Sequence, residues 1–383
     1  MQQRILIFAG YFLPFSGGYA NSIFQMAVRL RVRGHRVTIV TANTEGAASE
    51  EVLDDIRVYR LPCWNLLSGT FPVLKPSVRL WRMLQRLRAE RYSVISTQTR
   101  FFTTSLLGVI FARYNRIPYI HTERGSRHSV VRNPLVNWVS MAIDHTLGWW
   151  IVRGAKRVIG VSKAAQHFAL HLGAKEAQVI PNGVNEEFLR TPLKRTVASS
   201  GGVHLLYIGR LIYAKGIQDL LQALANVRKG GQNLHLTIVG SGPYSQILQA
   251  LAQQLRINDV VTFTGEQTRE QIAQLIPRHD VFINPSYSEG LPTSVLEAAA
   301  SGIAVIATDV GGTKEIVPSD RYGLLYTAGK VAELEGLILR YYEGTDERMQ
   351  AAELLAVRTR KEFSWTSVVE KYEAEFAQVT HNS

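Results

Sequence analysis

Short apolar runs alternate with helix-length segments along almost all of the 383 residues, and this alternation is broken once. Residues 191–202 lose all periodicity and fill with Ser, Gly and Thr, which is typical of a linker. Two successive series of strands and helices predict two doubly wound α/β domains, at residues 1–190 and 203–362. The expected strands are Arg4–Ala9, Arg36–Ala42, Val94–Gln98, Pro118–Thr122, Arg157–Ser162 and Gln178–Pro181, and, after the linker, His204–Gly209, Leu234–Gly240, Val260–Gly265, Asp280–Pro285, Ala304–Thr308 and Gly323–Thr327.

The last residues, 363–383, have a helical pattern of their own, and we expect this helix to pack back on the first domain. Its apolar positions include Trp365, Tyr372 and Phe376. Ligands of open parallel sheets bind beyond the carboxyl ends of the strands. With two such sheets, we expect the functional site in a cleft between the two domains.

Positive charge is concentrated in the first half of the chain. The net charge is +12, but residues 1–195 hold 27 Lys and Arg against 11 Asp and Glu, a balance of +16, and the remainder has a balance of −4. This asymmetry predicts that the first half faces an anionic partner, which can be nucleic acid, a phospholipid surface or a phosphorylated acceptor. The single cysteine, Cys63, excludes an internal disulfide. With no signal-peptide pattern and no long apolar run, we expect a cytoplasmic protein without a transmembrane helix.

The stretch NPSYSEGLPTSVLEAAASG, residues 284–302, carries the strongest chemical signal. A strand is expected to end at its start and a helix to begin near Thr293, so that Gly290 and the helix start form an anion site. Glu289 and Glu297 are expected to point to the same mouth, where each carboxylate can accept hydrogen bonds from sugar hydroxyls. The alternative is that Glu297 only favours the helix N-terminus and Glu289 lies in a solvated loop.

The segment GRLIYAKG, residues 209–216, follows the first predicted strand of the second domain. It places Arg210 and Lys215 at the carboxyl end of that strand, where a diphosphate needs cations. Two solvated surface cations are the alternative interpretation. We therefore treat the two side chains as candidates for anion binding.

Glycine-rich turns follow the first strand of the first domain (FSGGY) and a strand of the second (VGSGPY). Adjacent glycines at a helix entrance let a phosphate reach the backbone amides, and the second turn can seat a nucleobase or merely connect strand to helix. Neither segment is a GxGxxG or Walker motif, which disfavours NAD and ATP. The positions concerned are Gly17, Gly18, Gly240, Gly242 and Pro243.

Polar side chains are dense in PYIHTERGSRH, residues 118–128, just past a predicted buried strand of the first domain. A cleft would be lined at such a strand end. The sequence has no metal-ligand triad with recognised spacing, so no metal is expected. The candidate residues here are His121, Glu123, Arg124, Arg127 and His128.

Residues 77–91 (SVRLWRMLQRLRAER) predict a basic amphipathic helix. Val78, Trp81, Leu84 and Leu87 fall at helical spacing, and arginines populate the remaining surface. Such a helix can lie in a membrane interface or can be an ordinary packed helix with a solvated face. The basic first half favours contact with an anionic membrane surface.

Together these motifs resemble the retaining glycosyltransferase family 4, also called the group 1 glycosyltransferases, over nearly the whole chain. The most specific match is E-x7-E, formed by Glu289 and Glu297. Supporting matches are GR-x4-KG, VGSGP, PNGV at 181–184 and FSW at 363–365. The resemblance implies the GT-B architecture, in which two Rossmann-like domains face each other across a cleft and a final helix crosses back to the first.

The resemblance also implies a nucleoside-diphosphate sugar as the donor, with Arg210 and Lys215 neutralising the diphosphate. Glu297 would hold the ribose hydroxyls and Glu289 the donor sugar. Members of the family generally need no metal, so no cofactor is expected. The remaining implied donor-binding positions are Gly17, Gly18, Gly240, Gly242, Pro243, Gly290 and Leu291, with the backbone amides of the last two meeting the phosphates.

In many members of the family, a histidine after the fifth strand of the first domain contacts the sugar near the reacting carbon. His121 lies at that strand end here and is our catalytic candidate, together with Glu289, Arg210 and Lys215. Relatives with a TEHG form would instead place the histidine where this chain has Arg124. The acceptor side is expected to use Glu123, Arg124, Arg127 and His128.

The reaction implied is retaining transfer of a hexosyl unit, from a UDP-sugar or GDP-mannose type of donor, to a hydroxyl of a lipid-linked or cell-envelope glycan such as lipopolysaccharide. The enzyme is expected to rest on the inner face of the cell membrane. A nucleotide-sugar epimerase with the same two lobes is one alternative. A basic nucleic-acid-binding protein is another, but the chain has no recognition-helix or RNP-type signature, so no nucleic acid is expected as a partner. An inactive binding relative is disfavoured because Glu289, Glu297, Arg210 and Lys215 are all present.

Overall fold

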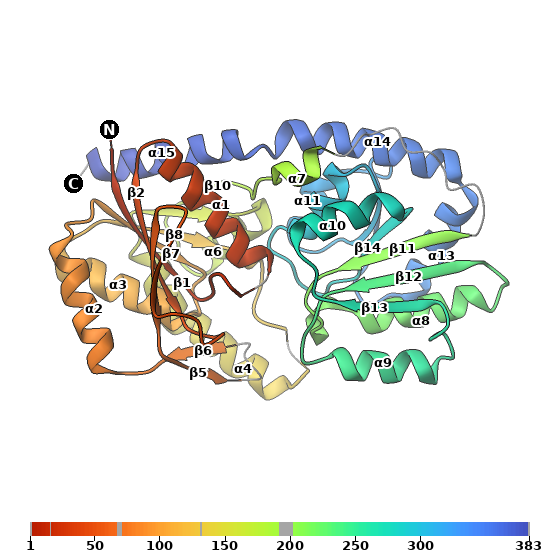
Figure 1. Cartoon of the computed structure of the whole chain (residues 1–383), viewed down its shortest axis with the longest axis horizontal. Coiled ribbons are helices and arrows are strands. Elements are labelled where there is room, and N and C mark those ends of the chain that lie inside the picture. Colours follow the sequence, from red (N-terminus) through yellow and green to blue (C-terminus); the bar gives the residue numbers. More distant parts are fainter. Residues whose placement is uncertain (1, 16, 67–70, 131, 191–201, 382–383) are drawn as a thin grey trace. The chain divides into compact units, whose positions relative to one another are not determined.

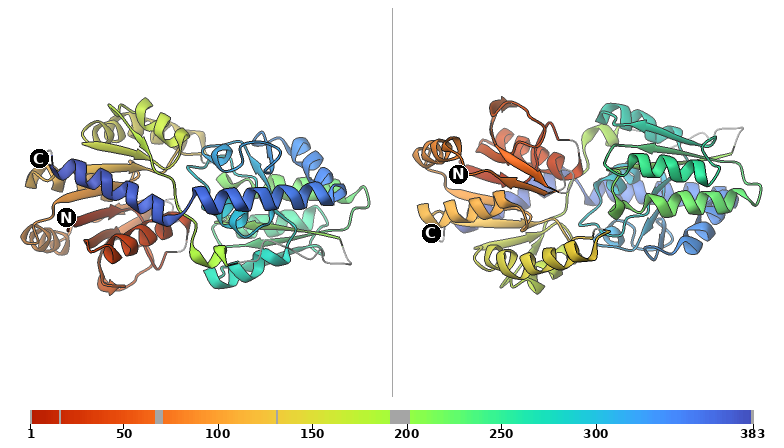
Figure 2. Two further views of the ribbon diagram at one scale, coloured as in Figure 1. Left: turned by 90° about the horizontal axis from the view of Figure 1, so that it is seen from above. Right: turned by 90° about the horizontal axis from the view of Figure 1, so that it is seen from below.

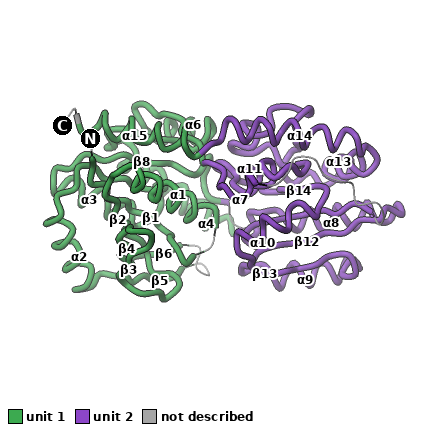
Figure 3. The backbone as a smooth tube through the Cα atoms, turned by 45° about the horizontal axis from the view of Figure 1, so that its top comes forward, with its two compact units in different colours: residues 1–129, 133–182, 365–383 green, residues 130–132, 183–364 purple. Residues whose placement is uncertain are grey.

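The computed structural model describes residues 2–15, 17–66, 71–130, 132–190 and 202–381. The chain divides into two compact units, of which the first comprises residues 1–129, 133–182 and 365–383, and the second residues 130–132 and 183–364 (Figure 3). The passage from the first unit to the second at Asn182 precedes the predicted linker, and of that linker only Gly202 is a described residue.

The first unit is built on an eight-stranded sheet with the order β10-β9-β8-β7-β1-β2-β4-β3. All neighbouring strands are parallel except β3 and β4. The strand order reverses at β1, which lies between β2 and β7 and so makes a topological switch point there. The strands are β1 (Arg4–Ala9), β2 (Arg36–Ala42), β3 (Glu50–Leu53), β4 (Ile56–Leu61), β7 (Val94–Gln98), β8 (Tyr119–Glu123), β9 (Arg157–Gly160) and β10 (Gln178–Val179).

The predicted strands of this unit are confirmed, but four further strands were not predicted. Strand β3 begins with Glu50 and Glu51, and β4 is interrupted by Arg57 and Arg60, so neither strand shows a continuous apolar run. Strands β5 (Cys63–Leu66) and β6 (Phe71–Leu74) form a separate antiparallel pair. A pair this short has too few positions to display a period of two.

Helices cover both faces of the first sheet (Figure 1). Because successive side chains of a strand point to opposite faces, Ile5 and Ile7 pack in one core with α1 and α15, while Leu6 and Phe8 pack in another with α2 and α3. The C-terminal helix α15 lies beside α1 (Figure 2), and its Phe376 is fully buried. The helices are α1 (Gly18–Val32), α2 (Val78–Ala89), α3 (Thr103–Asn115), α4 (Pro134–Ile143), a π-helix (Asp144–Gly148), α5 (Trp149–Arg153), α6 (Lys163–His171) and α15 (Trp365–His381).

Helix α2 packs on its unit through only two positions of its predicted apolar stripe, Leu84 and Leu87. Met83 and Leu87 are its buried residues, whereas Val78 and Trp81 are 68% and 63% exposed. Leu80 and Leu84 pack partly buried against the same core, so Val78 and Trp81 lie on the face of the helix that is turned to solvent. Helix α4 has no buried residue at all, and its Trp138 is 69% exposed. Among the helices of the described residues, none is long and apolar enough to cross a membrane.

The second unit contains a six-stranded, fully parallel sheet with the order β13-β12-β11-β14-β15-β16. The order reverses at β11, so the loops after β11 and β14 lie at the switch point. Every predicted strand of this unit is confirmed. The strands are β11 (Val203–Ile208), β12 (Leu234–Val239), β13 (Val261–Gly265), β14 (Val281–Asn284), β15 (Ala304–Thr308) and β16 (Leu324–Tyr326).

Helices also cover both faces of this second sheet (Figure 1), and its core includes Leu205, Leu236 and Ile306 from the strands and Leu220 and Leu224 from α8. Helix α11 begins at Thr293, where the sequence predicts it. The helices are α7 (Glu186–Leu189), a 3₁₀ turn (Tyr213–Lys215), α8 (Ile217–Arg228), α9 (Ser245–Gln254), α10 (Arg269–Leu275), α11 (Thr293–Ala300), α12 (Thr313–Ile316), α13 (Val331–Glu343) and α14 (Thr345–Glu362).

Candidate functional site

An ion pair joins the two loops at the switch point of the second unit. The Nζ atom of Lys215, which follows β11, lies 2.7 Å from a carboxylate oxygen of Glu289, which follows β14. The Asn284 side-chain amide donates to the same carboxylate over 3.4 Å. The Lys215 side chain is 24% exposed and that of Glu289 10% exposed, so both remain within reach of a ligand. The sequence predicts each residue at the site but not their pairing.

Backbone geometry holds these two loops together. The amide of Tyr287 donates to the carbonyl of Ala214 over 2.8 Å. Between the 3₁₀ turn and α8, Gly216 has a φ of 65°, and a Cβ atom at this position would overlap the carbonyl oxygen of Pro285. The close approach of two backbones therefore requires glycine here, and it fixes Lys215 beside Glu289.

A second backbone junction positions Arg210. The hydroxyl of Tyr207 donates to the carbonyl of Arg210 over 3.1 Å, and the next residue, Leu211, donates its amide to Ser241 over 2.7 Å. Gly240 and Gly242 have φ values of 132° and 156°, and a Cβ atom on either would overlap the carbonyl oxygens of Gly209 and Leu211 respectively. The predicted turn Gly240–Pro243 thus lies against the predicted cation segment.

Glu297 lies in a less polar environment than Glu289. It is on α11, and its nearest cation is Arg269 of α10, with 4.0 Å between a guanidinium nitrogen and a carboxylate oxygen. Burial raises the pKa of Glu297 to about 7, against the lowering effect of Arg269, while Glu187 of α7 raises it further. A carboxyl group that is half protonated at neutral pH can both donate and accept hydrogen bonds. In the loop before α11, the carbonyl of Gly290 accepts a hydrogen bond from the amide of Gly312 over 2.8 Å.

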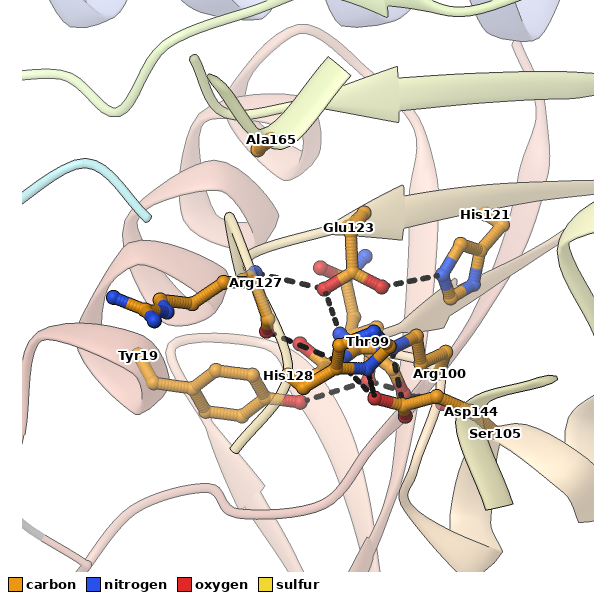
Figure 4. Close-up of polar contacts among 12 residues, drawn as sticks. Tyr19, Thr99, Arg100, Ser105, His121, Glu123, Arg127, His128, Asp144 and Ala165 are labelled. Carbon is orange, nitrogen blue, oxygen red and sulfur yellow. Dashed lines mark hydrogen bonds and ion pairs between the residues drawn. The ribbon is translucent and has the colours of Figure 1, made fainter. Parts of the chain in front are cut away.

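The first unit contains a buried charge cluster at the carboxyl ends of β7 and β8 (Figure 4). Arg100, 1% exposed, donates to both oxygens of Asp144 over 2.9 and 2.7 Å and to Glu123 over 3.0 Å. His121 lies between Thr97, 2.9 Å from its Nδ1, and Glu123, 3.5 Å from its Nε2. His121 and Glu123 are predicted site residues, whereas Arg100 and Asp144 were not predicted. A signal for Arg100 was present, because it closely follows a predicted strand end.

This cluster keeps Glu123 ionised. Burial alone would raise its pKa, but Arg100, His121 and the amide of Gly125, which donates over 2.7 Å, together lower the pKa to about 2. The side chain of His121 has no exposed surface. In this conformation the imidazole is therefore held as part of the buried network.

The other predicted residues of this region lie around the cluster. Arg124 donates to Gln98 and to Asn182, each over 2.9 Å, and its guanidinium lies 5.7 Å from the ring centroid of Tyr19. The carbonyl of Arg127 accepts from Arg100 over 3.3 Å, and Nδ1 of His128 lies 2.7 Å from Asp144. The loop after β8 thus carries these three side chains on a scaffold of buried ion pairs.

The glycine pair of the first unit lies at the N-terminus of α1. This helix begins at Gly18, and Gly17 precedes it with a φ of 151°. The hydroxyl of Tyr19, in the first turn, accepts from the amide of Gly10 and donates to the carbonyl of Gln98, both over 3.1 Å. These bonds tie the helix start to the carboxyl ends of β1 and β7.

Two family models match successive parts of the chain. Glycosyltransferase Family 4 matches residues 16–188, and Glycosyl transferases group 1 matches residues 193–354. An α-monoglucosyldiacylglycerol synthase of Streptococcus pneumoniae is 30% identical over 84% of this chain and 75% of its own length. An uncharacterized glycosyltransferase of Methanocaldococcus jannaschii is 26% identical over 99% of both chains.

Solved structures share the fold over the full length. Sucrose-phosphate synthase of Thermosynechococcus elongatus superposes with a TM-score of 0.81 at 21% identity, over 100% of both chains. An Anabaena protein, HepE, solved in complex with UDP-glucose, superposes with a TM-score of 0.76 at 19% identity, over 98% of this chain and 100% of its own. The predicted GT-B fold is confirmed. On the strength of the two family models and the relative from Streptococcus, this chain belongs to the family 4, or group 1, glycosyltransferases.

Proposed function

We propose that this glycosyltransferase moves a hexosyl unit from a nucleoside-diphosphate sugar to a hydroxyl of a lipid-linked or cell-envelope acceptor, with retention of anomeric configuration and without a metal. The ion pair between Lys215 and Glu289 at the switch point of the second sheet carries this proposal. It puts a cation and a hydrogen-bond acceptor side by side where open α/β sheets bind their ligands.

In the proposed donor complex, Lys215 and Arg210 neutralise the diphosphate, with help from the helix start that follows Gly290 and Leu291. Glu289 accepts hydrogen bonds from the sugar, and Glu297 holds the ribose. The turn Gly240–Pro243 lies against Arg210 through its backbone and supports the nucleoside. The structural neighbour with bound UDP-glucose supports a nucleotide-sugar donor.

The proposed reaction breaks the bond between the anomeric carbon and the diphosphate oxygen. A new bond then forms from the acceptor oxygen on the same face of the sugar, and the acceptor proton passes to the leaving phosphate. Lys215 and Arg210 stabilise the charge that develops on the diphosphate, which is the work that a metal does in other enzymes. Glu289 stabilises the oxocarbenium-like sugar.

Acceptor recognition is assigned to the first unit. Arg124, Arg127 and His128 lie on the loop that follows the ionised Glu123, and either His121 or Arg124 takes the position nearest the sugar. The charge balance of +16 in residues 1–195 favours an anionic acceptor or surface. The Streptococcus relative is named for a diacylglycerol product, and a human relative, 24% identical over 98% of this chain and 76% of its own length, is named a phosphatidylinositol N-acetylglucosaminyltransferase subunit. Both names support a lipid-bearing acceptor. We place the enzyme at the inner membrane face on the basic charge of residues 1–195.

The test is transfer activity of Lys215→Ala and Glu289→Gln variants with the donor selected from a panel of nucleotide sugars by thermal stabilisation. We expect kcat to fall at least about 100-fold in each, because both groups act on charge that develops in the transition state. NMR of the product should give the same anomeric configuration as the donor. An epimerase would instead convert the donor without any acceptor.

Exposed residues of the same unit supply matched controls, Lys229→Ala and Glu343→Gln, which should keep wild-type activity. Melting temperatures must agree among all four variants for the comparison to hold. Near-wild-type turnover in Lys215→Ala or Glu289→Gln would refute the assigned roles.

A further inference from the structure

Three histidines meet on the first unit, and only one of them, His128, also has a role in the proposed transfer, on the acceptor side. His128 comes from the loop after β8, His145 from the π-helix and His171 from the end of α6. One ring nitrogen of each lies within 4.8 Å of those of the other two. Their ring centroids are 5.2, 5.4 and 6.2 Å apart. We propose that these side chains form a binding site for a transition-metal dication of the Zn²⁺ class.

A buried carboxylate orients the first of these ligands. Nδ1 of His128 lies 2.7 Å from a carboxylate oxygen of Asp144, which has no exposed surface (Figure 4). When Nδ1 donates its proton to that carboxylate, the lone pair of the ring is on Nε2. A histidine whose second nitrogen donates to a carboxylate is the usual arrangement around protein-bound zinc. Asp144 is itself fixed by the two bonds from Arg100.

The π-helix supplies both a metal ligand, His145, and the carboxylate that orients His128, Asp144. Asp144 and His145 are consecutive, yet Asp144 is buried and His145 is exposed, so the carboxylate points inward and the imidazole outward. π-helical turns are rare and are found frequently at functional sites. On α6, Phe168 packs edge-on against His128, with 5.1 Å between centroids, and His171 follows one turn later.

The spacing suits a metal with only a small adjustment. Nitrogen ligands about 2.0–2.1 Å from a tetrahedral zinc ion lie roughly 3.4 Å from one another. The present separations of up to 4.8 Å exceed this, but His145 and His171 are exposed and can rotate toward the oriented His128. Three neutral imidazoles leave a fourth position for water, and this ligand set favours Zn²⁺, Ni²⁺ and Cu²⁺ over Mg²⁺. The metal would tie the loop after β8 to the π-helix and α6.

The test is metal binding by the full-length protein after chelator treatment, measured by isothermal titration with Zn²⁺ and by metal content after gel filtration. We expect one Zn²⁺ per chain, and at least a tenfold weaker affinity in His145→Ala and in His171→Ala. Both side chains are exposed, so these variants should fold. Mg²⁺ should not bind at this site.

The matched control is His167→Ala, because His167 is an exposed histidine one turn earlier on the same helix. It should bind Zn²⁺ as the wild type does. Equal affinity in His171→Ala and His167→Ala would overturn the site, as would less than one Zn²⁺ bound per chain at 100 µM free metal. Neither readout depends on transfer activity, so failure of the metal site and failure of the proposed transfer are distinguishable.

Discussion

Arg100 holds two carboxylates, Glu123 and Asp144, in a place where neither has exposed surface. The guanidinium group binds one carboxylate through two hydrogen bonds and the other through a third, and its Cζ atom lies 4.4 Å from the ring centroid of Phe168. The three charged partners come from positions 100, 123 and 144, and only the sheet and the π-helix bring them together. Ion pairs between residues so far apart in the chain produce no periodic pattern, so the sequence does not predict them.

Replacing this arginine should destabilise the first unit severely. Arg100→Met leaves both carboxylates buried without a counter-ion, and breaking a buried pair in this way costs about 3–5 kcal/mol. Urea unfolding followed by circular dichroism measures the loss. The control is Arg153→Met, an exposed arginine of α5, which should change the free energy of unfolding by less than about 0.5 kcal/mol. A similar cost in both variants would contradict the ion-pair role.

Glu297 should make the stability of the second unit depend on pH. Its pKa is about 7 in the folded chain against 4.5 for an ordinary glutamate, so the folded state binds the proton more tightly. The resulting stabilisation is complete below pH 4.5 and is lost as pH rises through 7, by about 3 kcal/mol at most. The charged groups that face the carboxyl are Arg269 and Glu187.

Comparison with Glu297→Gln isolates the contribution of Glu297 to the pH dependence of stability, because the wild type and the variant share all other titrating groups. Unfolding free energies measured between pH 4.5 and 8 should show the wild type losing stability relative to the variant as pH rises. A difference that stays constant over this range would place the pKa of Glu297 near its ordinary value.

At the scale of elements, the strands and helices that build the sites follow from local pattern, and the junctions between them do not. Buried strands such as β11 and β14 are continuous apolar runs, and α11 begins where the sequence predicts it. The contact of Gly216 with Pro285 joins loops that are far apart in the chain, and only the order of strands in the sheet makes them neighbours. The Lys215–Glu289 pair could therefore not be predicted without the strand order of the sheet.

Adding one methyl group at Gly216 should have a large effect on both stability and transfer activity. Gly216→Ala places a Cβ atom on the Pro285 carbonyl at a φ of 65°, so the two loops must separate. We expect a loss of about 1–3 kcal/mol in unfolding free energy and a clear loss of transfer, since Lys215 moves with its loop.

Gly336 offers the opposite case for comparison. It lies in α13 with nothing within 4 Å of a Cβ atom, so Gly336→Ala should stabilise the protein by about 0.5–1 kcal/mol. Denaturant unfolding of both variants, with transfer assays, tests the pair. Equal stability of the two alanine variants would show that the junction tolerates a side chain.

At the scale of the whole molecule, charge and apolar exposure coincide on the first unit. The balance of +16 in residues 1–195 was evident from composition, and so was the basic helix at 77–91. The orientation of this helix could not be predicted, because the apolar spacing of Val78 and Trp81 is equally consistent with a buried stripe. In the structure α2 buries Met83 and Leu87 and exposes Val78 and Trp81. An exposed tryptophan among arginines is typical of a helix that lies in a membrane interface.

This arrangement predicts salt-sensitive binding to anionic vesicles. Lys and Arg near a negatively charged membrane contribute roughly 1 kcal/mol each, and this attraction decays within a Debye length, so binding should weaken steeply as salt is raised. Trp81→Ser and Val78→Ser should each reduce co-sedimentation with phosphatidylglycerol vesicles, because each removes apolar surface from the interface. Val357→Ser, which alters a valine 54% exposed on α14 of the second unit, should leave binding unchanged. Equal loss from Val78→Ser and Val357→Ser would mean that α2 does not touch the membrane, and binding that survives high salt would mean that the basic charge of the first unit is not its cause.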